Sequence, residues 1–218
     1  MNVNSPPLTS ATEYNQLPQA GSTRFQETGT EQDEAGLIAA VRLGDLDAFN
    51  RLVLNYQARV FNHAHWILGE RENAEDITQE TFIRAFRRFN QFRGGSFRSW
   101  ILKIATNLCY DQMRYVKRHP VQPLEPTIDD EEQPETPLWI TDPRPLPEAE
   151  VEAAELRETL QRALNDLPAP YRSAVSLIDI QELSYIEAAA ILGVPTGTVK
   201  SRLARGRSLL RDTLSNAR

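Results

Sequence analysis

Cysteine is almost absent from this sequence: Cys109 is the one thiol among 218 residues. A single thiol excludes an intramolecular disulfide and a metal cluster built on cysteines. Because Cys109 lies in an apolar helical stretch, we expect a buried structural thiol rather than a redox sensor. The sequence also has no run of eighteen apolar residues, and its N-terminus lacks the basic start and apolar segment of a secretory signal. We therefore expect a cytoplasmic protein with no membrane insertion.

The common catalytic and cofactor-binding motifs are missing as well. The sequence contains no phosphate-binding loop, no dinucleotide fingerprint and no Gly-x-Ser-x-Gly elbow. His63 and His65 lie two positions apart, about 200° around a helix, so they cannot bind one metal ion together. The four acids between 72 and 80 lack the Glu-x-x-His unit of di-iron helices. We expect no catalytic residue, no metal and no cofactor.

Charge is distributed by segment in a chain whose net charge is −6. Residues 34–119 hold 13 basic and 9 acidic groups, whereas residues 120–149 hold eight acids and one arginine. Eight of the 14 prolines also fall in 120–149, which contains no glycine, so this segment cannot form a helix or a central strand. We predict a disordered polar tail over 1–33, a helical domain over 34–119, an acidic Pro-rich linker over 120–149 and a second domain over 150–218.

Helical periodicity fills both predicted domains, and no strand pattern of any length occurs. In the first domain, order should begin near Asp33, and a longer helix should run from a cap at Asp45 or Asp47 to Gly69. Two further helices are predicted over 73–86 and from Phe97 to about 117. In the second domain, helical patterns begin at 151 and again after 168. The sequence thus predicts an all-α protein made of two small helical domains.

The pattern of residues 184–205 predicts a helix-turn-helix. Ser184 followed by Glu187 forms a capping box, Gly193 ends the first helix, and Pro195 with Thr196 begins the second. An apolar stripe on the second helix should face the protein; it consists of Val199, Leu203, Gly206, Leu210 and Leu214. The opposite face and its flanks are polar and basic: Thr196, Thr198, Lys200, Ser201, Arg202 and Arg205. Such a helix suits a DNA major groove, although an ordinary solvated helix of a bundle gives the same pattern.

Two further faces are predicted in the first domain. Asp76, Gln79 and Glu80 should lie outside their helix without an evident partner, as a solvated face or as a docking site for a basic partner. In the next helix Trp100 and Asn107 follow a Gly-Gly-Ser loop at heptad spacing. Trp100 is either part of the core or an aromatic that stacks on an unpaired base.

Three motifs, in this order, resemble the extracytoplasmic-function sigma factors of bacterial RNA polymerase. They are DITQETFIRAF at 76–86, FRGGSFRSWILKIATN at 92–107 and LSYIEAAAILGVPTGTVKSRL at 183–203. The resemblance covers nearly all of residues 34–215. It departs from the family in a longer, more acidic linker and in an extra N-terminal tail of about thirty residues.

The resemblance implies partners and sites. It implies that the first domain grips the clamp of the polymerase's largest subunit through Asp76, Gln79 and Glu80, and that the second domain docks on the flap of the other large subunit. It implies contacts to the melted minus-10 promoter element, namely Ser96, Trp100, Lys103, Asn107 and Arg114, and to the minus-35 element, namely Thr196, Thr198, Lys200, Ser201, Arg202 and Arg205. An anti-sigma factor is a further implied partner.

Two other functions remain open at this point. A plain helix-turn-helix repressor or activator would explain residues 150–218 but would leave residues 76–107 without a role. A helical metal-dependent nuclease would use the acids of 72–80. Binding to core polymerase separates a sigma factor from the first alternative, and a metal assay tests the second.

Overall fold

The computed structural model describes the backbone of residues 31–119 and 148–216, and within these ranges it contains helices and no strand. Four helices form the first domain: α1 (Glu31–Arg42), α2 (Leu46–Leu68), α3 (Arg71–Arg87) and α4 (Phe97–Arg118), with a short 3₁₀ turn, η1 (Phe89–Gln91). The second domain contains α5 (Glu148–Asn165), α6 (Ala169–Val175), the π-helical turn η2 (Ser176–Ile180), α7 (Tyr185–Leu192) and α8 (Thr196–Asn216). The all-α prediction is therefore confirmed.

Local capping chemistry sets several helix ends where the sequence predicts them. Asp45 caps α2 by accepting a hydrogen bond from the Ala48 amide at 3.1 Å, and Gly69 ends the helix at φ 85°. A left-handed backbone of this kind favours glycine. Two helices begin earlier than predicted, because α1 starts at Glu31 and α5 at Glu148. The remainder of the predicted tail and linker lies outside the described residues.

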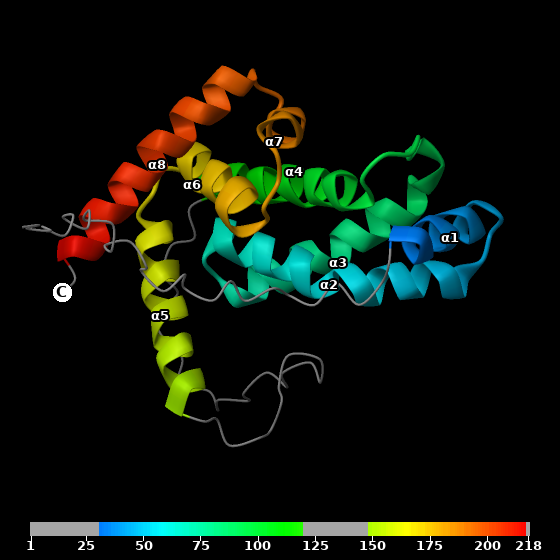
Figure 1. The fold of residues 1–218 in the computed structure, drawn as a ribbon, viewed down its shortest axis with the longest axis horizontal. Coiled ribbons are helices and arrows are strands. Elements are labelled where there is room, and N and C mark those ends of the chain that lie inside the picture. The colour runs from blue at the N-terminus through cyan, green and yellow to red at the C-terminus, as the bar shows by residue number, and fades with distance from the viewer. Residues whose placement is uncertain (1–30, 120–147, 217–218) are drawn as a thin grey trace, which may run out of the picture.

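In the first domain α2, α3 and α4 run alongside one another and α1 lies beside α2 (Figure 1). Their common core is apolar and rich in aromatic rings, including Phe49, Phe89, Phe92 and Phe97. Cys109 is fully buried beside Ala64 and Ile67, and burial raises the pKa of its thiol to about 12. This confirms the structural thiol, because an un-ionised buried thiol is a poor nucleophile.

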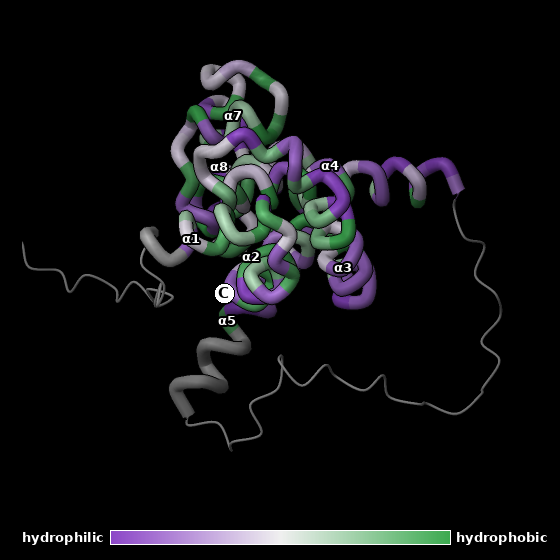
Figure 2. Tube along the Cα trace, turned by 90° about the vertical axis from the view of Figure 1, so that its right-hand side faces the viewer, coloured by the Kyte–Doolittle hydropathy of each residue, from purple (hydrophilic) through white to green (hydrophobic). Residues whose placement is uncertain are grey.

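The second domain packs directly against the first, which the sequence does not predict. One continuous apolar cluster joins Phe97 and Ile101 of α4 to Leu183, Ala188 and Val199 of the second domain. Figure 2 shows the apolar segments gathered where α2, α4, α7 and α8 meet, while the last turns of α4 project away from the body. None of the described helices combines the length and apolar composition that crossing a bilayer requires.

Candidate nucleic-acid interface

The face predicted on α3 is exposed and stands on a well-packed helix. Ile77, Thr81 and Phe82 are buried on one side of α3, whereas Asp76 and Gln79 are exposed on the other. Within the described ranges, neither Asp76 nor Gln79 makes a hydrogen bond or ion pair through its side chain. Both side chains are therefore available to a partner.

Glu80 differs from its two neighbours on this face. Its carboxylate accepts a hydrogen bond from Arg84 Nε at 2.6 Å, and both side chains are 38% exposed. The expectation that Glu80 lacks an intrachain partner is wrong, because the i,i+4 spacing on a helix places the two side chains together. The face therefore consists of a free acid and amide, Asp76 and Gln79, next to an ion pair.

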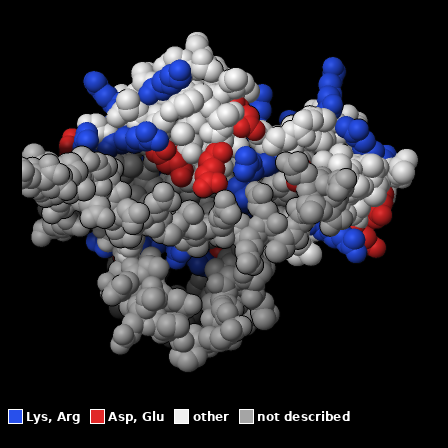
Figure 3. All heavy atoms as spheres, viewed as in Figure 1, with Lys and Arg blue, Asp and Glu red and all other residues white. Residues whose placement is uncertain are grey.

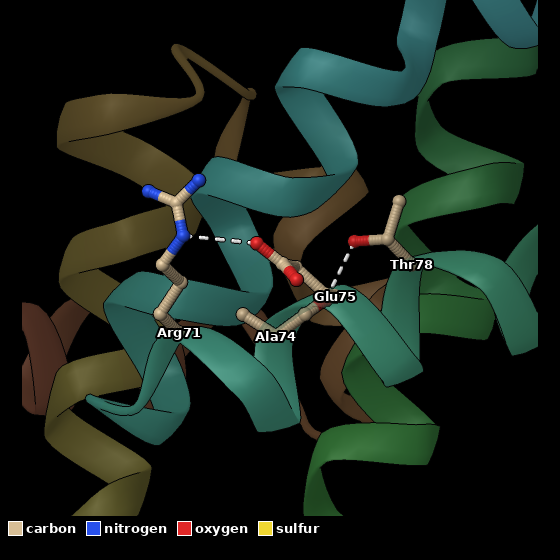
Figure 4. Close-up of polar contacts among 4 residues, drawn as sticks. All are labelled: Arg71, Ala74, Glu75 and Thr78. Carbon is tan, nitrogen blue, oxygen red and sulfur yellow. Dashed lines mark hydrogen bonds and ion pairs between the residues drawn. The ribbon is translucent and has the colours of Figure 1, made fainter. Parts of the chain in front are cut away.

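Polar side chains in the first turns of α3 also bond within the helix (Figure 4). Arg71 Nε donates to Glu75 Oε1 at 2.9 Å, so this acid is already partnered. Thr78 turns inward and its hydroxyl donates to the Ala74 carbonyl at 2.7 Å. Glu75 is therefore paired, whereas Asp76 forms no ion pair with any residue that the structure describes.

The loop before α4 is shaped by two glycines and a serine cap. Gly94 and Gly95 have φ values of 100° and 87°, a region that residues with a side chain rarely adopt. Ser96 then caps α4 by accepting a hydrogen bond from the Ser99 amide at 3.1 Å. Ser96 is exposed, so its predicted place at the edge of a strand-binding face is compatible with the structure.

Trp100 lies at the boundary between core and surface. Its ring packs against Phe89, Phe92 and Phe97 with centroid distances of 5.2–6.1 Å, yet the side chain is only partly buried. The two readings of Trp100 are therefore not exclusive, because one part of the indole fills the core while another stays open to a base.

Further along α4, three of the predicted residues are exposed: Lys103, Asn107 and Arg114. Arg114 forms an ion pair with Asp111 one turn earlier, where both side chains are more than half exposed. Exposed pairs of this kind contribute little to stability, so breaking this one to free Arg114 costs little. The result is a polar and basic strip that continues from Trp100 to the projecting end of the helix.

The helix-turn-helix forms as predicted. Ser184 Oγ accepts from the Glu187 amide at 3.2 Å while Glu187 Oε2 accepts from the Ser184 amide at 2.9 Å, which completes the capping box. Gly193 ends α7 in the left-handed region at φ 64°. α8 then begins at Thr196.

The predicted stripe of α8 faces the protein. Val199 and Leu203 are almost fully buried, and Gly206 packs so closely on α6 that a Cβ there would lie 2.8 Å from Val175. The opposite face is open: Thr196, Lys200, Ser201 and Arg205 are exposed and Thr198 and Arg202 are partly exposed. Lys and Arg side chains project over α8 at the upper left of Figure 3.

Two contacts near this face were not evident from the sequence. Lys200 Nζ lies 5.5 Å from the centroid of the Tyr185 ring, a cation–π distance that orients the amine. Arg207 makes two hydrogen bonds to Asp179, at 3.0 and 2.5 Å. This bidentate pair occupies Arg207, whereas Lys200, Arg202 and Arg205 form no ion pair with any residue that the structure describes.

Comparisons with known proteins assign both halves of the chain. Residues 52–119 match the family model for Sigma-70 region 2, and residues 157–210 match that for Sigma-70, region 4. The chain is 39% identical over 178 residues to the ECF RNA polymerase sigma factor SigW of Bacillus subtilis, an alignment that covers 81% of this chain and 94% of SigW. It is also 39% identical over 170 residues to SigE of Mycolicibacterium smegmatis, covering 78% of this chain and 63% of that longer protein.

Solved structures agree with these assignments. The sigma factor RpoE of Bartonella quintana, solved with the anti-sigma factor NepR, superposes with a TM-score of 0.58 at 27% identity, covering 78% of this chain and 98% of RpoE. A repressor would account for the match to region 4 but not for the match over residues 52–119. The chain is therefore an extracytoplasmic-function sigma factor, a promoter-recognising subunit of bacterial RNA polymerase.

Proposed function

We propose that each of the three exposed faces of this sigma factor binds a different partner. The α3 face, Asp76, Gln79 and Glu80, binds the clamp of the largest polymerase subunit. The α4 face binds the melted minus-10 element through Ser96, Trp100, Lys103, Asn107 and Arg114. The α8 face binds the minus-35 duplex through Thr196, Thr198, Lys200, Ser201, Arg202 and Arg205.

The observation that carries the proposal is that each set of polar residues is outward-facing on a helix whose opposite side is buried. Burial fixes the orientation of α3, α4 and α8, so their exposed side chains are held ready for a ligand. Different chemistry suits each partner: a carboxylate and an amide on α3, an indole with amide and cations on α4, and hydroxyls with cations on α8.

The α8 face has the features that duplex recognition requires. Cations at Lys200, Arg202 and Arg205 can neutralise phosphates or donate to guanine edges, and the exposed start of the helix at Thr196 favours an anion. The α4 face suits a single strand instead, because the partly exposed indole of Trp100 offers a stacking surface that a paired base cannot use.

The chemistry of RNA synthesis belongs to the polymerase in this proposal, and the sigma factor acts with it in the cytoplasm as an initiation factor. We also propose that an anti-sigma factor binds this chain, supported by the likeness to RpoE, whose structure was solved with NepR. The functional units would be residues 34–119 and 150–218, with 120–149 as their connector.

Selection of promoters by the holoenzyme tests the assignment of faces to elements. A library randomised at both elements is bound by core polymerase carrying wild type, Asn107→Ala or Arg205→Ala, and the bound DNA is sequenced. Asn107→Ala should relax the preference only in the downstream element and Arg205→Ala only in the upstream one. Relaxation of the opposite element, or of neither, would refute the assignment.

A further inference from the structure

Arg42, the last residue of α1, contacts the start of the loop that precedes α4. Its Nη2 donates a hydrogen bond of 2.9 Å to the carbonyl oxygen of Phe92, 50 positions later in the chain. The guanidinium carbon also lies 5.9 Å from the centroid of the Phe92 ring, a cation–π distance. Arg42 thus holds both the backbone and the side chain of Phe92.

The end of α1 that carries Arg42 is itself fixed. Leu37 of α1 is buried in the aromatic core, and Val41 packs against that core. The Gly44 amide donates to the Val41 carbonyl at 3.0 Å and closes the turn after the helix. A guanidinium is planar and carries several donors, so it can lie over a ring while it also bonds to a carbonyl. A lysine amine at this position would be a compact charge without a flat face.

The Phe92 ring connects Arg42 with Trp100. Phe92 is buried, and its ring centroid lies 5.2 Å from that of Trp100 and 5.7 Å from that of Phe97. Closely packed rings transmit displacement, because a protein interior has little free volume. The position of the partly exposed indole therefore depends on Phe92, which Arg42 holds in place.

The loop between Phe92 and α4 is anchored at both ends and open between them. At its far end Ser96 accepts a hydrogen bond from the Ser99 amide, and at its near end Arg42 bonds to the Phe92 carbonyl. Gly94 and Gly95 lie between these anchors, and a Cβ on either would meet no atom within 4 Å. Two consecutive glycines restrict the backbone very little, so the course of this loop is set by its ends.

We propose that Arg42 is a positioning residue for recognition of the melted minus-10 strand. It fixes the start of the loop over residues 93–96 and, through Phe92, the indole of Trp100. The inference rests on the function proposed above for α4, and it adds a residue of α1 to that face. Arg42 acts through Phe92 and needs no contact with the DNA.

A direct phosphate contact is the alternative role for Arg42. The residue is exposed, and its hydrogen bond to Phe92 uses one of the five N–H groups of the guanidinium. The two roles respond differently to substitution and to salt. Arg42→Lys keeps a phosphate contact, whereas it impairs positioning because the flat guanidinium is lost. Loss of a phosphate contact lowers the slope of log K against log salt by about 0.7 for a single strand, whereas loss of positioning leaves that slope unchanged.

Binding of holoenzyme to forked DNA tests the proposal. The duplex arm carries the minus-35 sequence that wild-type holoenzyme selects, and the minus-10 element is single-stranded and randomised. Arg42→Ala should reduce discrimination between the preferred and the average minus-10 sequence on the order of fivefold, as expected from the loss of one hydrogen bond, without changing the salt slope. Arg42→Lys should reduce discrimination by a smaller factor. The control Arg51→Ala removes an exposed arginine of α2 that forms no ion pair with a described residue, and it should bind as wild type does.

Exchange of backbone amide hydrogens for deuterium measures the anchoring separately. In Arg42→Ala the amides of residues 93–95 should exchange faster than in wild type, whereas those of α2 should not. Arg51→Ala should leave both sets unchanged. Equal exchange in the loop of Arg42→Ala and of wild type would overturn the anchoring, and the proposal with it.

Asn107→Ala in the same binding assay separates failure of this proposal from failure of the proposed function. Unchanged discrimination by Arg42→Ala, with reduced discrimination by Asn107→Ala, would overturn the positioning role and leave the α4 face standing. Unchanged discrimination by both variants would overturn both, with the fault in the function assigned to α4. A lower salt slope for Arg42→Ala, together with wild-type binding by Arg42→Lys, would assign Arg42 to a phosphate instead. If Arg42→Ala does not fold, the discrimination and salt slope of Arg42→Lys decide between the two roles.

Discussion

Ser99 of α4 and Glu187 of α7 lie 88 positions apart in the chain, yet the serine hydroxyl donates a hydrogen bond of 2.7 Å to the glutamate carboxylate. The same carboxylate caps the first helix of the helix-turn-helix through Ser184. Hydrogen bonds from Ser99 and Ser184 hold the pKa of Glu187 below its usual value. One side chain thus links the local fold of the helix-turn-helix to the contact between the two domains.

The buried His63 ring predicts a pH dependence of stability. Burial lowers the pKa of His63 from 6.5 to about 3, so the folded state stays unprotonated where the unfolded chain binds a proton. Stability should therefore fall as pH decreases below 6.5, at about 1.4 kcal/mol per pH unit, which gives about 2 kcal/mol between pH 6.5 and 5. The groups bonded to the ring, Thr106 and Ser176, are hydroxyls that do not titrate in this range.

Denaturant unfolding of wild type and His63→Gln from pH 8 to pH 5 measures this effect. The difference between the two profiles isolates the histidine, because the other groups are shared. Parallel profiles would show that His63 is not held neutral in the folded protein.

The α3 face predicts a defect in polymerase binding that leaves the fold intact. Asp76→Lys reverses an exposed, unpaired charge and should weaken binding to core polymerase on the order of tenfold or more, because interface charges act on partners of opposite sign. Glu80→Lys should add a small loss of stability, about 0.3–0.5 kcal/mol, since it also breaks the pair with Arg84.

Fluorescence anisotropy of labelled protein with purified core polymerase provides the measurement. Glu158→Lys, the same charge reversal on an exposed acid of α5, is the control and should bind as wild type does. Equal affinity for Asp76→Lys and wild type would remove α3 from the polymerase interface.

The α8 face predicts two distinct effects of Arg205→Ala. Loss of a base-edge contact should cost about 1–3 kcal/mol on the preferred minus-35 duplex and less on other sequences. Loss of a phosphate contact should instead weaken all duplexes alike and lower the slope of log K against log salt by about one. Titrations of holoenzyme over a salt series distinguish the two, with the exposed Arg162→Ala of α5 as the control. Binding that is unchanged at every salt concentration would exclude Arg205 from the interface.

The α4 face predicts that one substitution affects strand opening alone, whereas another affects both strand opening and stability. Asn107→Ala removes an exposed amide and should reduce opening of the minus-10 element, reported by a fluorescent base, without changing the melting temperature. Trp100→Ala should lower both, because the indole also packs on three phenylalanine rings. Asn55→Ala, an exposed amide on α2, is the control and should affect neither. Normal opening by Asn107→Ala would contradict the proposed strand contact.

The features that the sequence predicted well are the local ones. The caps at Asp45 and Ser184 and the left-handed ends at Gly69 and Gly193 depend on residues within one turn, so their chemistry is visible in the sequence. The buried stripe of α8 follows from its helical period in the same way.

The features that the sequence did not predict depend on contacts between segments that are far apart in the chain. Arg207 and Asp179 are 28 positions apart, and the histidine contact to Ser176 spans 113. No periodicity encodes such pairs. The helical pattern after 168 also gave no sign of the π-helical turn over residues 176–180, which contains Ser176, the hydrogen-bond partner of His63. Wider turns of this kind mark places where tertiary contacts override local preference. The pair Glu80–Arg84, by contrast, was open to prediction from its i,i+4 spacing.

Transcription from genomic DNA fragments by purified bacterial core polymerase tests the central claim most directly. With this protein added, the 5′ ends of the transcripts should map to a limited set of sites, each preceded by a shared pair of minus-35 and minus-10 sequences at nearly constant spacing. Arg205→Ala should reduce transcripts from these sites, while Arg162→Ala should not. Transcripts whose 5′ ends are scattered as they are with core polymerase alone would contradict the account of this chain as a promoter-recognising sigma factor.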